Sequence, residues 1–136
     1  MSWEAYVDNL CGNDAITKAT LIGLNGAIWT PKTKDAVLEV TAPEAMFIGS
    51  TMTSRNVLPF QTSGITIGGV KYMFLKDIDG DGKVITGKAR SVGNIILYST
   101  TSAVIIAFIP EEKADAARSA TTAVEKIGKY LEESGY

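Results

Sequence analysis

From residue 65 to residue 109 the chain repeats one pattern, a short apolar run followed by turn residues. The runs are rich in β-branched and aromatic side chains, and they cover residues 65–67, 70–76, 83–89, 94–100 and 103–109. Short runs of this kind, separated by turn residues, are typical of strands joined by tight turns. The pattern therefore predicts an antiparallel meander. Because the faces of such a sheet must be covered, we expect an α+β fold with helices from both ends of the chain.

Three segments outside the meander carry helix signals. In residues 2–10, Ser2 can serve as the N-cap, and one face is apolar at Trp3, Tyr6, Val7 and Leu10. Residues 41–44, TAPE, form a capping box, so a middle helix should run to about Ser54. Pro110 can open a final helix, in which the apolar stripe consists of Ala117, Ala120, Val124, Ile127 and Leu131.

Residues 15–30 contain Asn25-Gly26 between two apolar runs. Asn-Gly accepts the positive φ angles of a type I′ turn. This stretch therefore predicts a hairpin of two strands.

Composition limits the classes of function. The 136 residues fit one domain, residues 1–136, and the net charge of −2 gives no strong attraction to nucleic acid. There is no histidine, which excludes Ser-His and Cys-His nucleophiles, and the longest apolar run, residues 103–109, is too short to span a bilayer. No secretory leader is recognisable, and the lone Cys11 suits a reducing cytosol.

Asp77, Asp79, Asp81 and Gly82 have the spacing of a calcium-binding loop. Position 12 of that loop would be Lys88, where an EF-hand needs a bidentate Glu, and strands rather than helices are expected on both sides. Asp and Gly also favour hairpin turns. We interpret the loop as a turn and expect no metal site, although the carboxylates could hold a cation weakly.

Large aromatic side chains stand near both chain ends: Trp3, Tyr6, Tyr130 and Tyr136. They could simply form the buried face of the first helix and its neighbours. Alternatively, a partly exposed cluster of Trp and Tyr would suit proline-rich ligands. A polyproline II helix lays its rings flat on aromatic faces, and its free carbonyls accept hydrogen bonds.

Several stretches together resemble the profilin family. MSWEAYVDNL is similar to its N-terminal signature, LIGLNGAIWT to the hairpin carrying the next tryptophan, and GITIGGVKYMFLK to its central strand. TGKARSVGNIILYSTTSAVIIAFI resembles the last strands, and VEKIGKYLEESGY the C-terminal helix and aromatic tail. The resemblance implies a profilin-like fold. In it, the N- and C-terminal helices pack on one face of a central antiparallel sheet and a shorter helix packs on the other.

The resemblance also implies a function. Profilins bind monomeric actin, promote exchange of its nucleotide and dock proline-rich partners such as formins, while phosphoinositides compete at a basic surface. The polyproline face would consist of Trp3, Tyr6, Trp29, Tyr130, Leu131 and Tyr136. The actin face would consist of Lys71, Lys88, Arg90, Arg118 and Thr122, with the first three on sheet strands. Such a protein would be a binding module, not an enzyme, and would need no cofactor of its own. It would be cytoplasmic and associated with the cytoskeleton.

Two other functions remain open. Residues 117–121 and the IPEE stretch after the last strand depart from the family pattern, which allows an adaptor with weakened actin binding that binds proline-rich ligands or phosphoinositides. The aspartate loop allows a calcium-responsive protein.

Overall fold

The computed structural model describes residues 3–136, so the expected N-cap Ser2 lies outside the described residues. A six-stranded antiparallel sheet has the strand order β1-β6-β5-β4-β3-β2. Its strands are β1 (Lys18–Gly23), β2 (Ile65–Ile67), β3 (Val70–Asp77), β4 (Val84–Ala89), β5 (Gly93–Ser99) and β6 (Ala103–Pro110). The helices are α1 (Trp3–Cys11), α2 (Ala42–Ser54), α3 (Leu58–Ser63), the 3-10 helix η1 (Glu111–Ala116) and α4 (Ala117–Glu133). The expected meander and α+β fold are confirmed.

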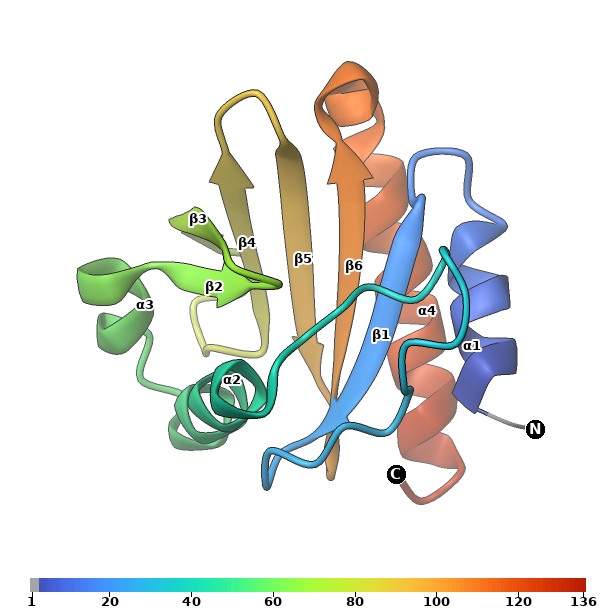
Figure 1. The fold of residues 1–136 in the computed structure, drawn as a ribbon. Helices are drawn as coiled ribbons and strands as arrows, with labels where there is room; N and C mark the ends of the chain where they lie inside the picture. The colour runs from blue at the N-terminus through green and yellow to red at the C-terminus, as the bar shows by residue number, and fades with distance from the viewer. Residues whose placement is uncertain (1–2) are drawn as a thin grey trace.

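Helices cover both faces of the sheet (Figure 1). The terminal helices α1 and α4 lie side by side on one face, and α2 lies on the other. Alternate residues of β5 and β6 point to the two sides: Ile96 and Ile105 join the core under α1 and α4, whereas Leu97 and Ile106 join the core under α2. Burial on both faces explains why residues 103–109 form an unbroken apolar run.

The expected shorter helix on the face opposite α1 and α4 is present as α2, and α3 packs against the same core. α2 has 13 residues, fewer than the 17 of α4 but more than the 9 of α1. α3 has 6 residues, and sequence analysis missed it. None of the helices within residues 3–136 is long and apolar enough to cross a membrane.

The capping box at the start of α2 is confirmed. The Glu44 N–H donates to Thr41 Oγ1 at 3.4 Å, and the Thr41 N–H donates to Glu44 Oε1 at 2.9 Å. The same carboxylate accepts from the N–H groups of Gly68, at 2.8 Å, and Gly69, at 3.0 Å, in the β2–β3 turn. Burial opposes ionisation, but these main-chain hydrogen bonds outweigh it and lower the pKa of Glu44. Glu44 therefore joins the start of α2 to the sheet.

The expected hairpin at residues 15–30 is confirmed only in part: the chain turns back on β1 in the antiparallel sense, but residues 24–30 form no second strand. After β1 the chain makes only an isolated bridge between Ile22 and Ile28. Gly26 has a φ of 89°, but Asn25 does not take the positive φ that a type I′ turn requires. Instead, Gly23 pairs with Ala27 across a three-residue loop. Residues 36–38 then run along β1 in the parallel sense and cover its outer edge, where a second hairpin strand would have paired.

The final helix begins later than expected. Pro110 ends β6 and caps η1, and α4 begins only at Ala117. Short 3-10 turns are frequent at the N-termini of α-helices. Lys113 Nζ donates to the Asp14 carbonyl at 2.7 Å, which ties η1 to the loop before β1.

The aspartate loop is the turn of the β3–β4 hairpin, as we interpreted it. Asp77 accepts from the N–H groups of Gly80 and Gly82, at 3.1 and 2.9 Å, and Asp81 accepts from the Lys83 N–H at 3.0 Å. Two of its three carboxylates therefore bond the main chain of the loop itself. Within residues 3–136, no group of three or more His, Cys, Asp or Glu side chains is arranged to hold a metal ion.

Candidate functional site

Five aromatic rings from distant parts of the chain form one cluster at the ends of α1 and α4. We call Trp3, Tyr6, Trp29, Tyr130 and Tyr136 the aromatic cluster. The Trp3 ring centroid lies 4.6 Å from that of Trp29, 5.0 Å from Tyr136 and 5.5 Å from Tyr6. Tyr130 lies 6.2 Å from Tyr6, and Tyr136 lies 6.2 Å from Trp29. The structure thus brings together all five of the aromatic residues that we assigned to the polyproline face.

The cluster is layered from the core to the surface. Tyr6 is 5% exposed and belongs to the core, whereas Tyr130 and Tyr136 are 50% and 42% exposed. Trp3 and Trp29 are partly buried between these levels. Burial, and next the neighbouring Tyr130, raise the pKa of Tyr6. The base of the cluster is therefore core, and its top is open to solvent, the arrangement that a proline-rich ligand would need.

Leu131, the sixth residue assigned to this face, lies beneath the rings. It is fully buried in the core cluster under α1 and α4. The side chain supports the floor of the cluster and has no surface of its own to offer a ligand.

Close packing on the sheet sets the position of α4. Its inward face carries Ala120, Val124, Gly128 and Leu131. At Gly128 the helix meets the Tyr98 ring of β5 so closely that a Cβ atom there would overlap the ring. The small residue lets α4 lie low on the sheet, where Tyr130 can meet Tyr6 of α1.

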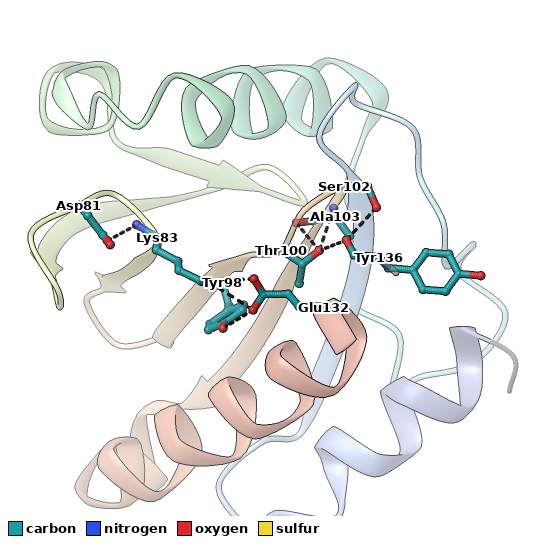
Figure 2. Close-up of polar contacts among 8 residues, drawn as sticks. All are labelled: Asp81, Lys83, Tyr98, Thr100, Ser102, Ala103, Glu132 and Tyr136. Atoms are coloured by element: carbon teal, nitrogen blue, oxygen red, sulfur yellow. Dashed lines mark hydrogen bonds and ion pairs between the residues drawn. The ribbon is translucent and has the colours of Figure 1, made fainter. Parts of the chain in front are cut away.

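A polar network holds the last turn of α4 (Figure 2). Glu132 pairs with Lys83 Nζ at 2.9 Å and accepts from the Tyr98 hydroxyl at 2.8 Å. Burial, and next the bond to Glu132, raise the pKa of Tyr98 well above its usual range. Burial opposes ionisation of Glu132, but the bonds from Lys83 and Tyr98 lower its pKa. Sequence analysis missed these residues, because 34 and 49 positions separate the partners and no short motif joins them.

The residues assigned to actin lie on β3, β4, the turn after β4, and α4. Lys71 is on β3 and Lys88 on β4, where Lys88 stands opposite Met73. Arg90 is a correction: it lies in the turn just after β4, not on a strand. All three side chains are exposed, and we call them the basic patch. Lys88 lies four positions after Val84 on β4, so both side chains point to the same face of the sheet. Val84 belongs to the core under α1 and α4, and the basic patch continues that face beyond the helices.

Apolar side chains accompany the basic patch. Met73 and Leu75 are 71% and 51% exposed, and both line a shallow pocket with Lys88, Arg90 and Glu111. Arg118 and Thr122, the other two residues assigned to actin, are exposed on the first turns of α4. The Thr122 hydroxyl donates to the Arg118 carbonyl at 3.2 Å, so these two residues are neighbours along the helix.

Comparison with known proteins identifies the family. The family model described as Profilin matches residues 1–136. The chain belongs to the profilin family. Profilins are actin-binding proteins of the cytoskeleton and not enzymes. The chain is 34% identical to the profilin of Strongylocentrotus purpuratus, and the match covers 97% of each protein.

Solved profilin structures share the fold. Profilin IA of Acanthamoeba castellanii has a TM-score of 0.82 and 31% identity, and the match covers 99% of this chain and 100% of that one. Mouse profilin IIa, solved in complex with a double repeat from the FH1 domain of mDia1, has a TM-score of 0.73 over 100% of both chains. At 22% identity, this second likeness shows the fold alone. The profilin fold that we expected is thus confirmed.

Proposed function

We propose that this chain binds monomeric actin on one surface and proline-rich segments on another, and so delivers actin to assembly factors such as formins. The observation that carries the proposal is the aromatic cluster. Its base is buried and its top is open, which suits a stiff, extended ligand that can lay its rings on the open aromatic faces. A polyproline II helix is already extended, so it loses little conformational entropy on binding.

The chemistry of the cluster matches such a ligand. Proline rings can lie on the faces of Trp3, Trp29 and Tyr136. Indole N–H and phenol O–H groups can donate to the ligand's free carbonyls, which have no partner within a polyproline II helix. Mouse profilin IIa, which shares the fold, was solved with a formin FH1 repeat, and this supports proline-rich partners for the chain.

The basic patch and α4 supply the second surface. Lys71, Lys88 and Arg90 combine positive charge with the exposed Met73 and Leu75. A mixed apolar and basic surface suits an acidic protein partner, which we infer to be actin, given the family. Arg118 and Thr122 would extend this surface along α4. Binding there would promote exchange of actin's nucleotide, and phosphoinositides would compete through their phosphates for the same positive charge.

Calorimetric titration of the protein with monomeric actin and with a peptide of about ten prolines tests both surfaces. We expect each ligand to bind, and the second to bind equally well when the first is already present, because the two surfaces are separate. Binding of the peptide without actin would instead favour an adaptor with weakened actin binding. Failure of both ligands to bind would contradict the proposal.

A further inference from the structure

The turn between β5 and β6 holds the main chain of Tyr136. The main-chain oxygen of Tyr136 accepts from the Ser102 N–H at 2.7 Å, from Thr100 Oγ1 at 2.8 Å and from Ser102 Oγ at 2.9 Å (Figure 2). Three donors from one turn thus converge on one oxygen. We call these three hydrogen bonds the chain-end anchor.

A second device turns the chain toward this anchor. Gly135 has a φ of 96°, and the N–H groups of Tyr136 and Gly135 donate to the carbonyls of Leu131 and Glu132, at 2.9 and 3.1 Å. This pattern is a Schellman motif, in which the glycine takes the left-handed conformation just beyond the helix. It ends α4 and directs the next residue back over the sheet.

The Tyr136 ring is only partly enclosed by its neighbours. The ring is 42% exposed, and its aromatic contacts are Trp3, at 5.0 Å, and Trp29, at 6.2 Å. Tyr136 lies beyond the end of α4, where the helix no longer orders the backbone. The chain-end anchor fixes the backbone from which the ring projects.

We propose that Thr100 and Ser102 are positioning residues of the aromatic cluster: they hold the Tyr136 ring beside Trp3 and Trp29 before a proline-rich ligand arrives. This inference rests on the proposed function. Neither side chain is among the rings that would touch the ligand. Their effect is to lower the entropy cost of binding, since the ring is already ordered in the free protein.

The test compares variants within one turn. Ser102→Ala removes one donor to Tyr136 and keeps the backbone N–H, and Thr100→Val removes a second. The double variant should bind a peptide of about ten prolines about fivefold more weakly, the size expected for one or two lost hydrogen bonds. Thr100→Ser keeps the hydroxyl, so replacing Thr100→Val by Thr100→Ser should restore most of the peptide affinity that Thr100→Val removes. Thr101→Val, an equal change at an exposed position of the same turn, should leave the affinity unchanged.

A double-mutant cycle separates positioning from general stability. In a Tyr136→Ala background the Thr100 and Ser102 substitutions should cost no further affinity, because the ring they position is gone. An equal loss in both backgrounds would overturn the proposal and assign the two residues a purely structural role.

Tryptophan fluorescence of the free protein provides a readout that needs no ligand. The double variant should change the emission of Trp3 and Trp29, and Thr101→Val should not. If the parent protein ignores the peptide, the proposed function fails, and the emission alone then decides whether the turn positions Tyr136. Unchanged emission in the double variant would overturn the positioning role.

Discussion

Tyr130 and Leu131 are neighbours in α4 but face opposite environments. Tyr130 is half exposed beside Tyr6, whereas Leu131 is fully buried beneath the rings. On a helix, adjacent residues point about 100° apart, so one position can serve the surface while the next serves the core. At the residue scale, the distinction that matters within the aromatic cluster is therefore whether a side chain is core, surface or partly both.

Trp3 lies partly in the core and partly at the surface, so its replacement should affect peptide binding more than folding. Trp3→Ala should weaken binding of a peptide of about ten prolines by about thirtyfold, the effect of losing an anchor worth about 2 kcal/mol. The cost in unfolding free energy should fall below the 3–5 kcal/mol typical of emptying a fully buried Trp site, because Trp3 is only partly covered.

Calorimetric binding and thermal unfolding of the same samples check this prediction. Leu58→Ala, at a 59% exposed position of α3, is the control and should leave peptide affinity unchanged. A sharp fall in Tm for Trp3→Ala, together with unchanged peptide affinity, would show that Trp3 is an ordinary core residue.

The basic patch has a role defined by charge. Reversing Lys88 and Arg90 to Glu should slow association with actin, and the loss should shrink as salt is added, because salt screens exposed charges. Stopped-flow association at several ionic strengths measures the effect. Lys18→Glu with Lys32→Glu changes the net charge equally at the β1 end of the sheet and should have a smaller effect. If the Lys88 and Arg90 variant associated with actin as fast as the parent, the actin face would have to lie elsewhere on the molecule.

At the scale of elements, side chains join parts that are distant in sequence. Glu44 connects the start of α2 to the β2–β3 turn, and Glu132 connects the end of α4 to Lys83 and Tyr98. Each carboxylate satisfies donors at an element boundary, where backbone or side-chain groups would otherwise need water.

Replacing Glu44 should loosen α2 from the sheet. Glu44→Ala should lower the unfolding free energy by about 1–2 kcal/mol, since it removes the cap and the bonds to Gly68 and Gly69. Glu133→Ala, an exposed change near the end of α4, is the control. Denaturant unfolding measures both, and equal stability of the two variants would contradict the bridging role.

The Glu44 contribution should depend on pH with a known sign. The pKa of Glu44 is lower in the folded state, so its contribution is fully present above the unfolded-state pKa of about 4.3 and is lost as pH falls through the folded-state value. Glu44→Gln should therefore reduce the loss of stability between pH 5 and more acidic solution, as followed by Tm. If Tm fell equally with pH in the parent and in the Glu44→Gln variant, Glu44 would not contribute to the loss of stability in acid.

The β3–β4 loop should not respond to calcium. The Asp77 and Asp81 carboxylates accept hydrogen bonds from the loop's own N–H groups, and Lys88 stands where an EF-hand has its bidentate Glu. Micromolar calcium should leave Tm and peptide binding unchanged. A rise of several degrees would overturn this expectation, since stabilisation grows as RT ln(1 + [L]/Kd).

For the whole molecule, local sequence patterns predicted the sheet and most of the helices, but not the contacts between segments that are distant in sequence. The capping box at Thr41 and the strand runs between residues 65 and 109 depend on neighbours in sequence, and they were predicted. The three-residue loop before Ala27 was not predicted. The β1 edge is covered by residues 36–38, a contact between segments that no local pattern indicates. Likewise, no local pattern pairs Thr100 with Tyr136, which lie 36 positions apart. Four residues of the aromatic cluster were noticed as aromatics near the chain ends, and family resemblance added Trp29. The burial of Leu131 required the fold.

The two proposed surfaces use different parts of one sheet face. The aromatic cluster lies where α1 and α4 cover the sheet, and the basic patch lies on and just after β3 and β4, beyond the helices. Because the surfaces are separate, a single small domain could hold actin and a proline-rich segment at once.

Titration of the unmodified protein with a peptide of about ten prolines, followed by tryptophan fluorescence, is the decisive test of binding at the aromatic cluster. Both tryptophans lie in the aromatic cluster, so we expect a saturable change in emission as the peptide covers them. A matched peptide of alternating glycine and serine should leave the emission unchanged. Emission that stays constant at every concentration of the proline peptide would contradict the account.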